Sequence, residues 1–193
     1  MPTSPPSLIV LSGPSGSGKT TICKELAKDP RVRFSVSATT RAMRPGEQDG
    51  REYWFLSETE FEHRVQAGAF LEHVRYNGNR YGTLLSELRK GESRGETVLL
   101  EIEVQGTRKL REQQVPGVYV FIMPPSEAVL RERLQRRGTE RPEDVEKRLQ
   151  IARSEMEQRT LYDHVVVNDD LERAVQETRE RVGLLPRAGT GSR

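Results

Sequence analysis

The chain alternates between short apolar runs and stretches in which apolar residues recur at helical spacing. Five apolar or β-branched runs predict buried strands, at residues 8–13, 34–40, 97–104, 118–124 and 164–169. Between most of these runs, apolar residues recur at helical spacing among charged residues, as they do after Lys19, Ser126 and Pro142. Strand followed by helix, repeated, predicts an α/β fold with a central, mainly parallel sheet flanked by helices on both faces.

Residues 34–83 depart from this alternation. They hold short alternating runs, one helical segment and an Asn-Gly pair at residues 77–78 that favours a hairpin turn. Ser57 and Glu60 form a capping-box pattern at the start of the helical segment, and Gly68 is a typical helix stop. We therefore expect a mostly antiparallel subdomain inserted into the core.

Composition and charge narrow the class of protein. Charged residues make up 31% of the 193 residues and hydrophobic residues 34%, which is typical of one globular body. The net charge is +2 and the basic residues are spread along the chain, so we expect no nucleic-acid partner. Cys23 is the single cysteine, and we interpret it as a small buried residue in a reducing compartment. No segment resembles a signal peptide or a membrane span, so we expect a cytoplasmic protein that binds no membrane.

One loop carries a specific chemical signal. The residues from Gly13 to Thr20 read G-P-S-G-S-G-K-T, which matches the pattern G-x-x-x-x-G-K-[ST] between a predicted strand and a predicted helix. Glycines let backbone N–H groups turn toward an anion, and Lys19 places a charge at the outer phosphates. The hydroxyl of Thr20, or alternatively that of Thr21, would ligate Mg²⁺. The loop predicts binding of a nucleoside triphosphate and leaves open a kinase, a GTPase or a motor.

Charged residues elsewhere suggest what receives the phosphate. Arg41 and Arg44 lie three residues apart beside a Pro-Gly turn, a spacing that suits two guanidinium groups on one phosphate, although solvated arginines are the alternative. Glu101 and Glu103 close a buried run, and strand alternation would place both carboxylates on the same face. The arginine-rich run from residue 131 to 149 has the alternating charge of a solvated helix face.

Eight segments in order resemble those of guanylate kinases: SGPSGSGKTT, FSVSATTRAMRPGE, GREYWF, FLEH, GNRYGT, LLEIEVQG, RLQRRGTE and VVVNDD. The resemblance runs from about Ile9 to Leu184. It implies one domain with a P-loop NTPase core, a GMP-binding insertion and a helical lid. The implied core spans about 8–33, 84–124 and 155–185, the insertion about 34–83, the lid about 125–154, and a disordered tail about 186–193.

The activity implied by the resemblance is transfer of the γ-phosphate of ATP to GMP, and also to dGMP, with Mg²⁺, by a monomer or homodimer. Two other interpretations remain. Related domains also serve as non-catalytic protein-binding modules, but those typically lose the phosphate loop. Another small-molecule kinase with the same loop would accept a different monophosphate, against which Ser37, Glu72 and the tyrosines argue.

Site residues follow from the resemblance position by position. The implied catalytic residues are Lys19, Arg41, Arg137 and Arg148. The implied ATP-binding residues are Gly13, Pro14, Ser15, Gly16, Ser17, Gly18, Lys19, Thr20, Thr21, Arg133, Arg137 and Asn168. The implied GMP-binding residues are Ser37, Arg41, Arg44, Tyr53, Glu72, Tyr81, Thr83, Glu101 and Glu103.

Some of these positions carry a more detailed expectation. Glu72 and Ser37 would read the base, because a carboxylate accepts hydrogen bonds from guanine N1–H and the exocyclic amine together. Glu101 is the candidate to hold Mg²⁺ through water beside Thr20, although the separate roles of Glu101 and Glu103 stay open, since the family more often has aspartate there. Asn168 would contact adenine, cap the helix that begins at Leu171, or do both.

Overall fold

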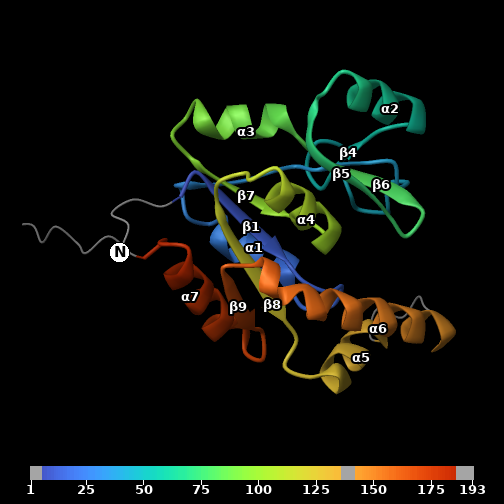
Figure 1. Cartoon of the computed structure of the whole chain (residues 1–193), viewed down its shortest axis with the longest axis vertical. Coiled ribbons are helices and arrows are strands. Elements are labelled where there is room, and N and C mark those ends of the chain that lie inside the picture. Colours follow the sequence, from blue (N-terminus) through green and yellow to red (C-terminus); the bar gives the residue numbers. More distant parts are fainter. Residues whose placement is uncertain (1–5, 136–141, 186–193) are drawn as a thin grey trace, which may run out of the picture.

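The computed structural model describes residues 6–135 and 142–185, which form two sheets (Figure 1). The larger is a five-stranded, all-parallel sheet in the order β2-β7-β1-β8-β9. Its strands are β1 (Leu8–Ser12), β2 (Val32–Phe34), β7 (Thr97–Glu101), β8 (Val118–Met123) and β9 (His164–Val167). The parallel core that the sequence predicts is therefore confirmed.

The smaller sheet has the order β4-β3-β6-β5. Its strands are β3 (Ala38–Thr39), β4 (Trp54–Phe55), β5 (Phe70–Tyr76) and β6 (Asn79–Leu84). The β3–β6 and β5–β6 pairs are antiparallel and the β3–β4 pair is parallel, so the expectation of a mostly antiparallel sheet is confirmed. Asn77 and Gly78 both have positive φ, 46° and 81°, as the predicted hairpin turn requires.

Helices join most of these strands. They are α1 (Lys19–Leu26), α2 (Glu58–Gln66), α3 (Leu85–Glu92), α4 (Val104–Glu112), α5 (Glu127–Gln135), α6 (Pro142–Glu157), the 3₁₀ helix η1 (Gln158–Leu161) and α7 (Leu171–Arg181). Ser57 caps α2 as predicted, because its Oγ accepts a hydrogen bond from the N–H of Glu60 at 3.1 Å. Gly68 follows α2 with φ of 64°, which confirms the predicted stop.

Apolar side chains fill both faces of the central sheet. Ile9 and Leu11 of β1 pack into the cluster that holds the apolar faces of α1 and α7, and Cys23 is buried in that cluster as expected. Leu8 and Val10 alternate to the other face and pack with the cluster of α4. Helices thus cover both faces, which leaves the carboxyl ends of the strands to form the site.

The predicted strand at 34–40 is wrong. The pairing of β2 with β7 ends at Phe34, and the N–H of Ser35 still donates to the Leu99 carbonyl at 3.0 Å. The chain then leaves the central sheet, and β3 pairs inside the smaller one. Alternating apolar and polar residues suit either sheet, so the pattern alone could not reveal the change of partner.

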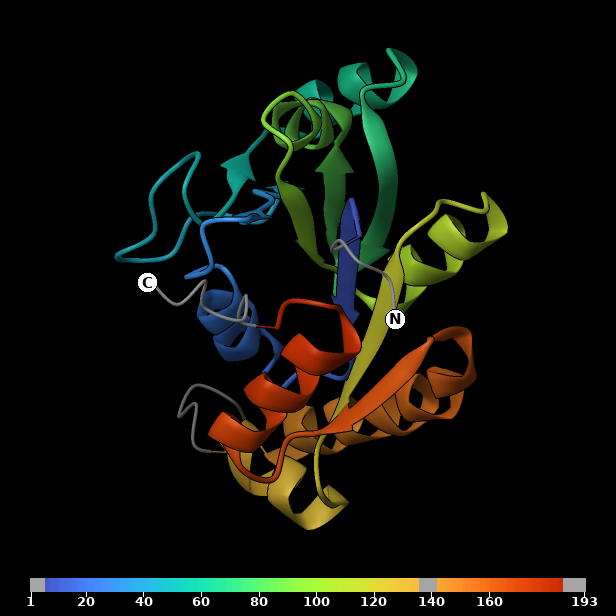
Figure 2. The same cartoon turned by 90° about the vertical axis from the view of Figure 1, so that its left-hand side faces the viewer.

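Two bodies flank the central sheet. Figures 1 and 2 both place the smaller sheet with α2 on one side of it and the helices α5 and α6 on the other. The latter two pack on each other through an apolar cluster of their own, made of Leu130, Leu134, Val145, Leu149 and Ala152. In the described part of the chain, no helix is both long and apolar enough to cross a membrane. Arg137 and the tail at 186–193 lie outside the described residues.

Candidate active site

The phosphate loop joins β1 to α1, and its glycines hold conformations that other residues rarely adopt. Gly13, Gly16 and Gly18 have φ of 142°, 92° and 93°. A Cβ at Gly13 would lie 2.2 Å from the Ile122 carbonyl oxygen, so glycine alone fits there. The N-terminus of α1 has no side-chain cap, so its positive end is available to an anion.

Lys19 is the first residue of α1, and its side chain folds back over this loop. Its Nζ donates to the carbonyl oxygens of Gly13 at 2.6 Å and Pro14 at 3.1 Å, and the residue is only 8% exposed. These bonds hold the ammonium against the loop backbone, where it adds a full charge to the helix end.

Asn168, which follows β9, braces the loop from behind. Its Nδ2 donates to the Ser17 carbonyl at 2.7 Å, and the guanidinium of Arg133 bridges the carbonyls of Ser17 and Asn168 at 3.4 and 3.0 Å. The alternative that Asn168 caps α7 is wrong, because the carboxylate of Asp170 caps that helix by accepting from the N–H of Arg173. The sequence could not separate two cap-forming residues that lie two positions apart.

A second arginine from the helical pair also reaches the loop. Arg148 of α6 donates from Nη2 to the Ser15 hydroxyl at 2.6 Å. Two of the three arginines implied for the lid thus contact the phosphate loop, Arg133 from α5 and Arg148 from α6.

Thr20 and Glu101 place a hydroxyl and a carboxylate side by side next to the loop. The Thr20 hydroxyl donates to Glu101 Oε1 at 2.6 Å, and this bond joins α1 to the end of β7. Among the described residues, no group of three or more His, Cys, Asp or Glu side chains is arranged to hold a metal. A hydroxyl and a carboxylate nevertheless fit Mg²⁺, which typically takes one or two protein oxygens together with water and phosphate oxygens.

Glu103 does not lie on the strand as expected. β7 ends at Glu101, and Glu103 is the residue that precedes α4, so strand alternation does not place the two carboxylates. Glu103 Oε2 is buried and has no hydrogen-bond partner within the described residues. Burial raises the pKa of Glu103, as does the charge of Glu101, while Lys19 and Arg148 lower it.

The residues predicted to read the base meet on the smaller sheet. Glu72 of β5 is 4% exposed, and its Oε1 accepts from both the N–H and the hydroxyl of Thr83, at 3.1 and 2.8 Å. Ala38 pairs with Gly82, which puts Ser37 beside Thr83 on the next strand. Burial raises the pKa of Glu72 to about 7, even though the bonds from Thr83 favour the charged form.

Arg41, Tyr53 and Tyr81, three of the residues implied for GMP binding, also meet. The Arg41 guanidinium carbon lies 5.4 Å from the centroid of the Tyr53 ring, and the rings of Tyr53 and Tyr81 are 6.0 Å apart. Burial raises the pKa of Tyr53 to about 12, which keeps its hydroxyl a donor. The Arg44 side chain is exposed, and only its backbone N–H joins the group, by donating to a Glu47 oxygen at 2.8 Å.

Sequence reasoning missed Glu47. Its carboxylate receives two hydrogen bonds from Arg41 Nη2, at 2.8 and 3.0 Å, in addition to the backbone bond from Arg44. The signal was its place in the Pro-Gly turn, three residues after Arg44, where a carboxylate can accept from the arginines that precede it.

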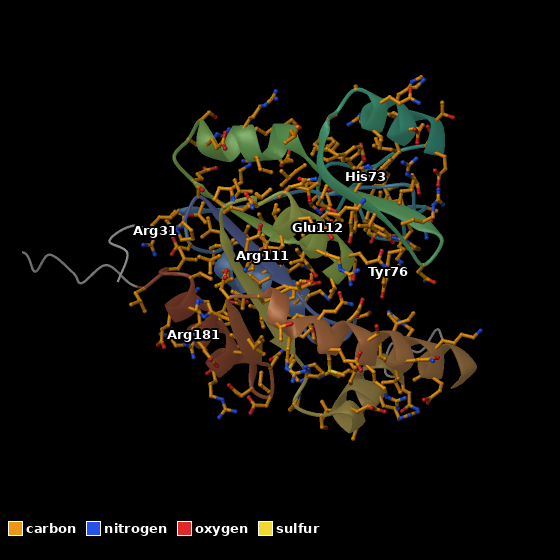
Figure 3. The ribbon with its side chains drawn as sticks, in the orientation of Figure 1. Arg31, His73, Tyr76, Arg111, Glu112 and Arg181 are labelled. Atoms are coloured by element: carbon orange, nitrogen blue, oxygen red, sulfur yellow. The ribbon has the colours of Figure 1, made fainter. Side chains whose placement is uncertain are left out.

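Tyr76 and Glu155 were missed as well. Figure 3 shows Tyr76 at the hairpin end of β5, toward α6. Burial raises the pKa of Tyr76, with further increases from Glu103 and Glu155 and a decrease from Arg148. Glu155 of α6 is itself buried, and burial raises its pKa to about 7. The hairpin, the start of α4 and α6 therefore face one another around the phosphate loop.

Most of this chain matches one known protein family. The family model described as guanylate kinase matches residues 6–183. The chain belongs to the guanylate kinase family. Within this family, it is 50% identical over 181 residues to a guanylate kinase of Symbiobacterium thermophilum, covering 93% of this chain and 86% of the relative. It is 49% identical over 169 residues to one of Halalkalibacterium halodurans, covering 87% and 83%. The crystal structure of a guanylate kinase from Anaplasma phagocytophilum superposes with a TM-score of 0.76 at 33% identity, covering 94% of this chain and 87% of that chain.

Proposed function

We propose that this chain transfers the γ-phosphate of ATP to GMP, giving ADP and GDP, with dGMP as a further acceptor, in purine nucleotide synthesis and GMP recycling. The observation that carries the proposal is a buried carboxylate, Glu72, on a sheet separate from the one that carries the phosphate loop. A phosphate loop alone suits many enzymes, whereas a buried hydrogen-bond acceptor on the sheet that also brings together Arg41, Tyr53 and Tyr81 suits a purine monophosphate with N–H donors.

The chain would act as one cytoplasmic domain, as a monomer or homodimer. Its core, about 8–33, 84–124 and 155–185, would hold ATP. The insertion at about 34–83 would hold GMP, and the lid at about 125–154 would close over both. The contacts of Arg133 and Arg148 with the loop support this division, because they link the helical pair to the ATP side.

Glu72 would choose the base. Both of its described hydrogen bonds fall on Oε1, so carboxylate lone pairs remain for guanine N1–H and the exocyclic amine. Adenine offers neither donor at those positions. Ser37 and Thr83 would support the same edge of the base, and Glu101 and Glu103 would line the path between the two nucleotides.

Position and charge would drive the transfer. An acceptor phosphate oxygen is already anionic, so no residue has to activate a nucleophile. Arg41, Arg44, Tyr53 and Tyr81 would hold the acceptor phosphate. The other charges would come from Lys19, Arg148 and Arg137, which stabilise the transferring group and help to exclude water. Mg²⁺ bound beside Thr20 and Glu101 would neutralise charge on the donor phosphates.

A screen of acceptors tests this proposal directly. With ATP and Mg²⁺, we expect rapid ADP formation with GMP, formation also with dGMP, and rates near background with AMP, CMP and UMP, measured in a coupled ADP assay. Background rates with all five nucleotides would instead favour a non-catalytic binding module. Fast turnover with AMP, CMP or UMP in place of GMP would favour another kinase.

Replacing Thr20 tests the metal assignment. Thr20→Val removes the hydroxyl that bonds to Glu101 and keeps the shape, so the Mg²⁺ concentration for half-maximal rate should rise at least about tenfold. The matched control is Thr21→Val, one residue further along the exposed start of α1. If Thr21→Val shows the larger rise, then Thr21 and not Thr20 serves the metal.

A further inference from the structure

Helix α4 lies directly against the carboxylate of Glu72. A Cβ at Gly106 would lie 2.7 Å from Glu72 Oε2 and 3.2 Å from its Cδ, so the helix backbone passes within contact distance of the acid. Lys109 lies three residues further along, on the same side of the helix. Its Nζ donates to the backbone carbonyl of His73, the residue that follows Glu72 on β5. Figure 3 labels His73 on this strand.

We propose that Lys109 is a positioning residue for base recognition, because its ammonium, held on the His73 carbonyl, compensates the buried charge of Glu72 and keeps that carboxylate in the ionised form that guanine requires. The inference rests on the proposed role of Glu72 as base reader. It adds a residue that no sequence motif singles out.

Several groups face Glu72, and their effects oppose one another. Burial is the largest influence and raises the pKa of Glu72 to about 7. Thr83 of β6 lowers that pKa through its two hydrogen bonds, Lys109 of α4 lowers it by its charge, and Glu103 at the start of α4 raises it. Desolvation therefore outweighs what these partners restore, and because the resulting pKa is about 7, the charge of Lys109 matters near neutral pH.

His73, the residue after Glu72, adds no charge beside this carboxylate above neutral pH. The His73 ring packs near Phe61 and Phe70, at centroid distances of 6.3 and 6.0 Å. Burial lowers the pKa of His73 below its usual value, with Lys109 and Arg80 acting in the same direction. His73 is therefore neutral above about pH 7, and pH effects in that range report on Glu72.

The size of the effect follows from the ionisation of Glu72. With its pKa near 7, about half of the free protein carries the charged form at pH 7. Loss of an opposite charge nearby disfavours that form by about tenfold or more, which would leave about a tenth ionised. Guanine binding should therefore weaken about fivefold at pH 7. At pH 9 it should be almost unchanged, because Glu72 is ionised there both in wild type and in a variant without the Lys109 charge.

Three substitutions at Lys109 separate charge from anchoring. Lys109→Met removes both, Lys109→Gln keeps a donor for the His73 carbonyl but removes the charge, and Lys109→Arg keeps both. The dissociation constant for GMP is measured by calorimetry from pH 6.5 to 9, without ATP or Mg²⁺. The second ionisation of the GMP phosphate affects all variants alike, so the ratio to wild type reports on the protein.

We expect Lys109→Met and Lys109→Gln to bind GMP about fivefold more weakly than wild type at pH 7 and as tightly as wild type at pH 9. Lys109→Arg should stay close to wild type at both. GMP binding should also release more protons at pH 7 in the Met and Gln variants, as read from buffers of different ionisation enthalpy. The proposal would be overturned if Lys109→Gln bound GMP as tightly as wild type at every pH. It would also be overturned if Lys109→Met bound GMP weakly even at pH 9 and had a lowered Tm.

Glu72→Gln, measured in parallel, distinguishes a failure of the base-reading role of Glu72 from a failure of the positioning role of Lys109. If Glu72→Gln binds GMP as wild type does, the base-reading role itself is wrong. If Glu72→Gln is weak and Lys109→Gln is normal throughout, only the role of Lys109 is wrong. In the double variant, the Lys109→Gln change should add nothing to the loss caused by Glu72→Gln, because no charge is left to compensate.

Discussion

Lys19→Ala should lower kcat by about 10²- to 10³-fold and leave the dissociation constant for GMP within about twofold. The Lys19 ammonium is held on two carbonyls of the phosphate loop, where it would meet the donor phosphates. Except for Glu101 and Glu103, the residues proposed for GMP lie on or beside the strands of the smaller sheet, so the acceptor site should survive. Steady-state kinetics give kcat, and calorimetry with GMP alone gives the dissociation constant.

Lys24→Ala is the matched control for this experiment. Lys24 lies on the same helix as Lys19 and is exposed, so its removal costs the same formal charge without touching the loop. We expect wild-type kcat from the control. Near-normal kcat in Lys19→Ala would contradict the assignment of the loop, and a loss of GMP affinity equal to the loss of kcat would show that the change disturbs the whole fold.

Much of the fold is predictable because its signals are local. Four of the five core strands, β1, β7, β8 and β9, follow apolar runs, and helices between them leave a parallel sheet as the arrangement that buries those runs. The phosphate loop is similarly predictable, since glycines with positive φ and a lysine at fixed spacing serve one chemistry. The Asn-Gly turn and the Ser57 cap need only neighbouring residues as well.

The remainder depends on contacts between distant residues, which local patterns do not encode. The break after Phe34 depends on which strand offers a partner, and Glu103 lies at the start of α4 because β7 ends two residues earlier. Lys109 meets the His73 carbonyl across a separation of 36 residues, and its own neighbours carry no sign of that contact. From the sequence alone, charged residues on a helix are predicted to be solvated surface, and only the tertiary structure shows which of them has a partner.

Glu72→Gln is the change that should alter substrate choice most. An amide accepts at its oxygen but presents N–H₂ toward the second guanine donor, so one hydrogen bond is lost and two donors face each other. Sites built to hydrogen-bond a substrate reject analogues without those groups by about 10⁴-fold, and wild type should reject AMP on that scale. The variant should lose most of this discrimination, chiefly through a lower kcat/KM for GMP.

The pH dependence of kcat/KM for GMP in wild type should also reflect Glu72. Because burial raises the pKa of Glu72 to about 7, acid protonates the carboxylate and removes an acceptor, so kcat/KM for GMP should fall below about pH 7. In Glu72→Gln this step should be absent, since an amide does not titrate in the range. ATP binding should remain normal in the variant, because the phosphate loop lies on the other sheet.

Glu87→Gln is the control that separates base recognition from the neutralisation of any buried carboxylate. Glu87 of α3 is 1% exposed and pairs with Lys90 and Arg33, away from the proposed base site. Its substitution should lower the Tm and leave the ratio of kcat/KM for GMP over AMP unchanged. If Glu72→Gln instead keeps wild-type kcat/KM for GMP and wild-type rejection of AMP, Glu72 does not read the base, and guanine recognition would then rest on Ser37 and Glu103.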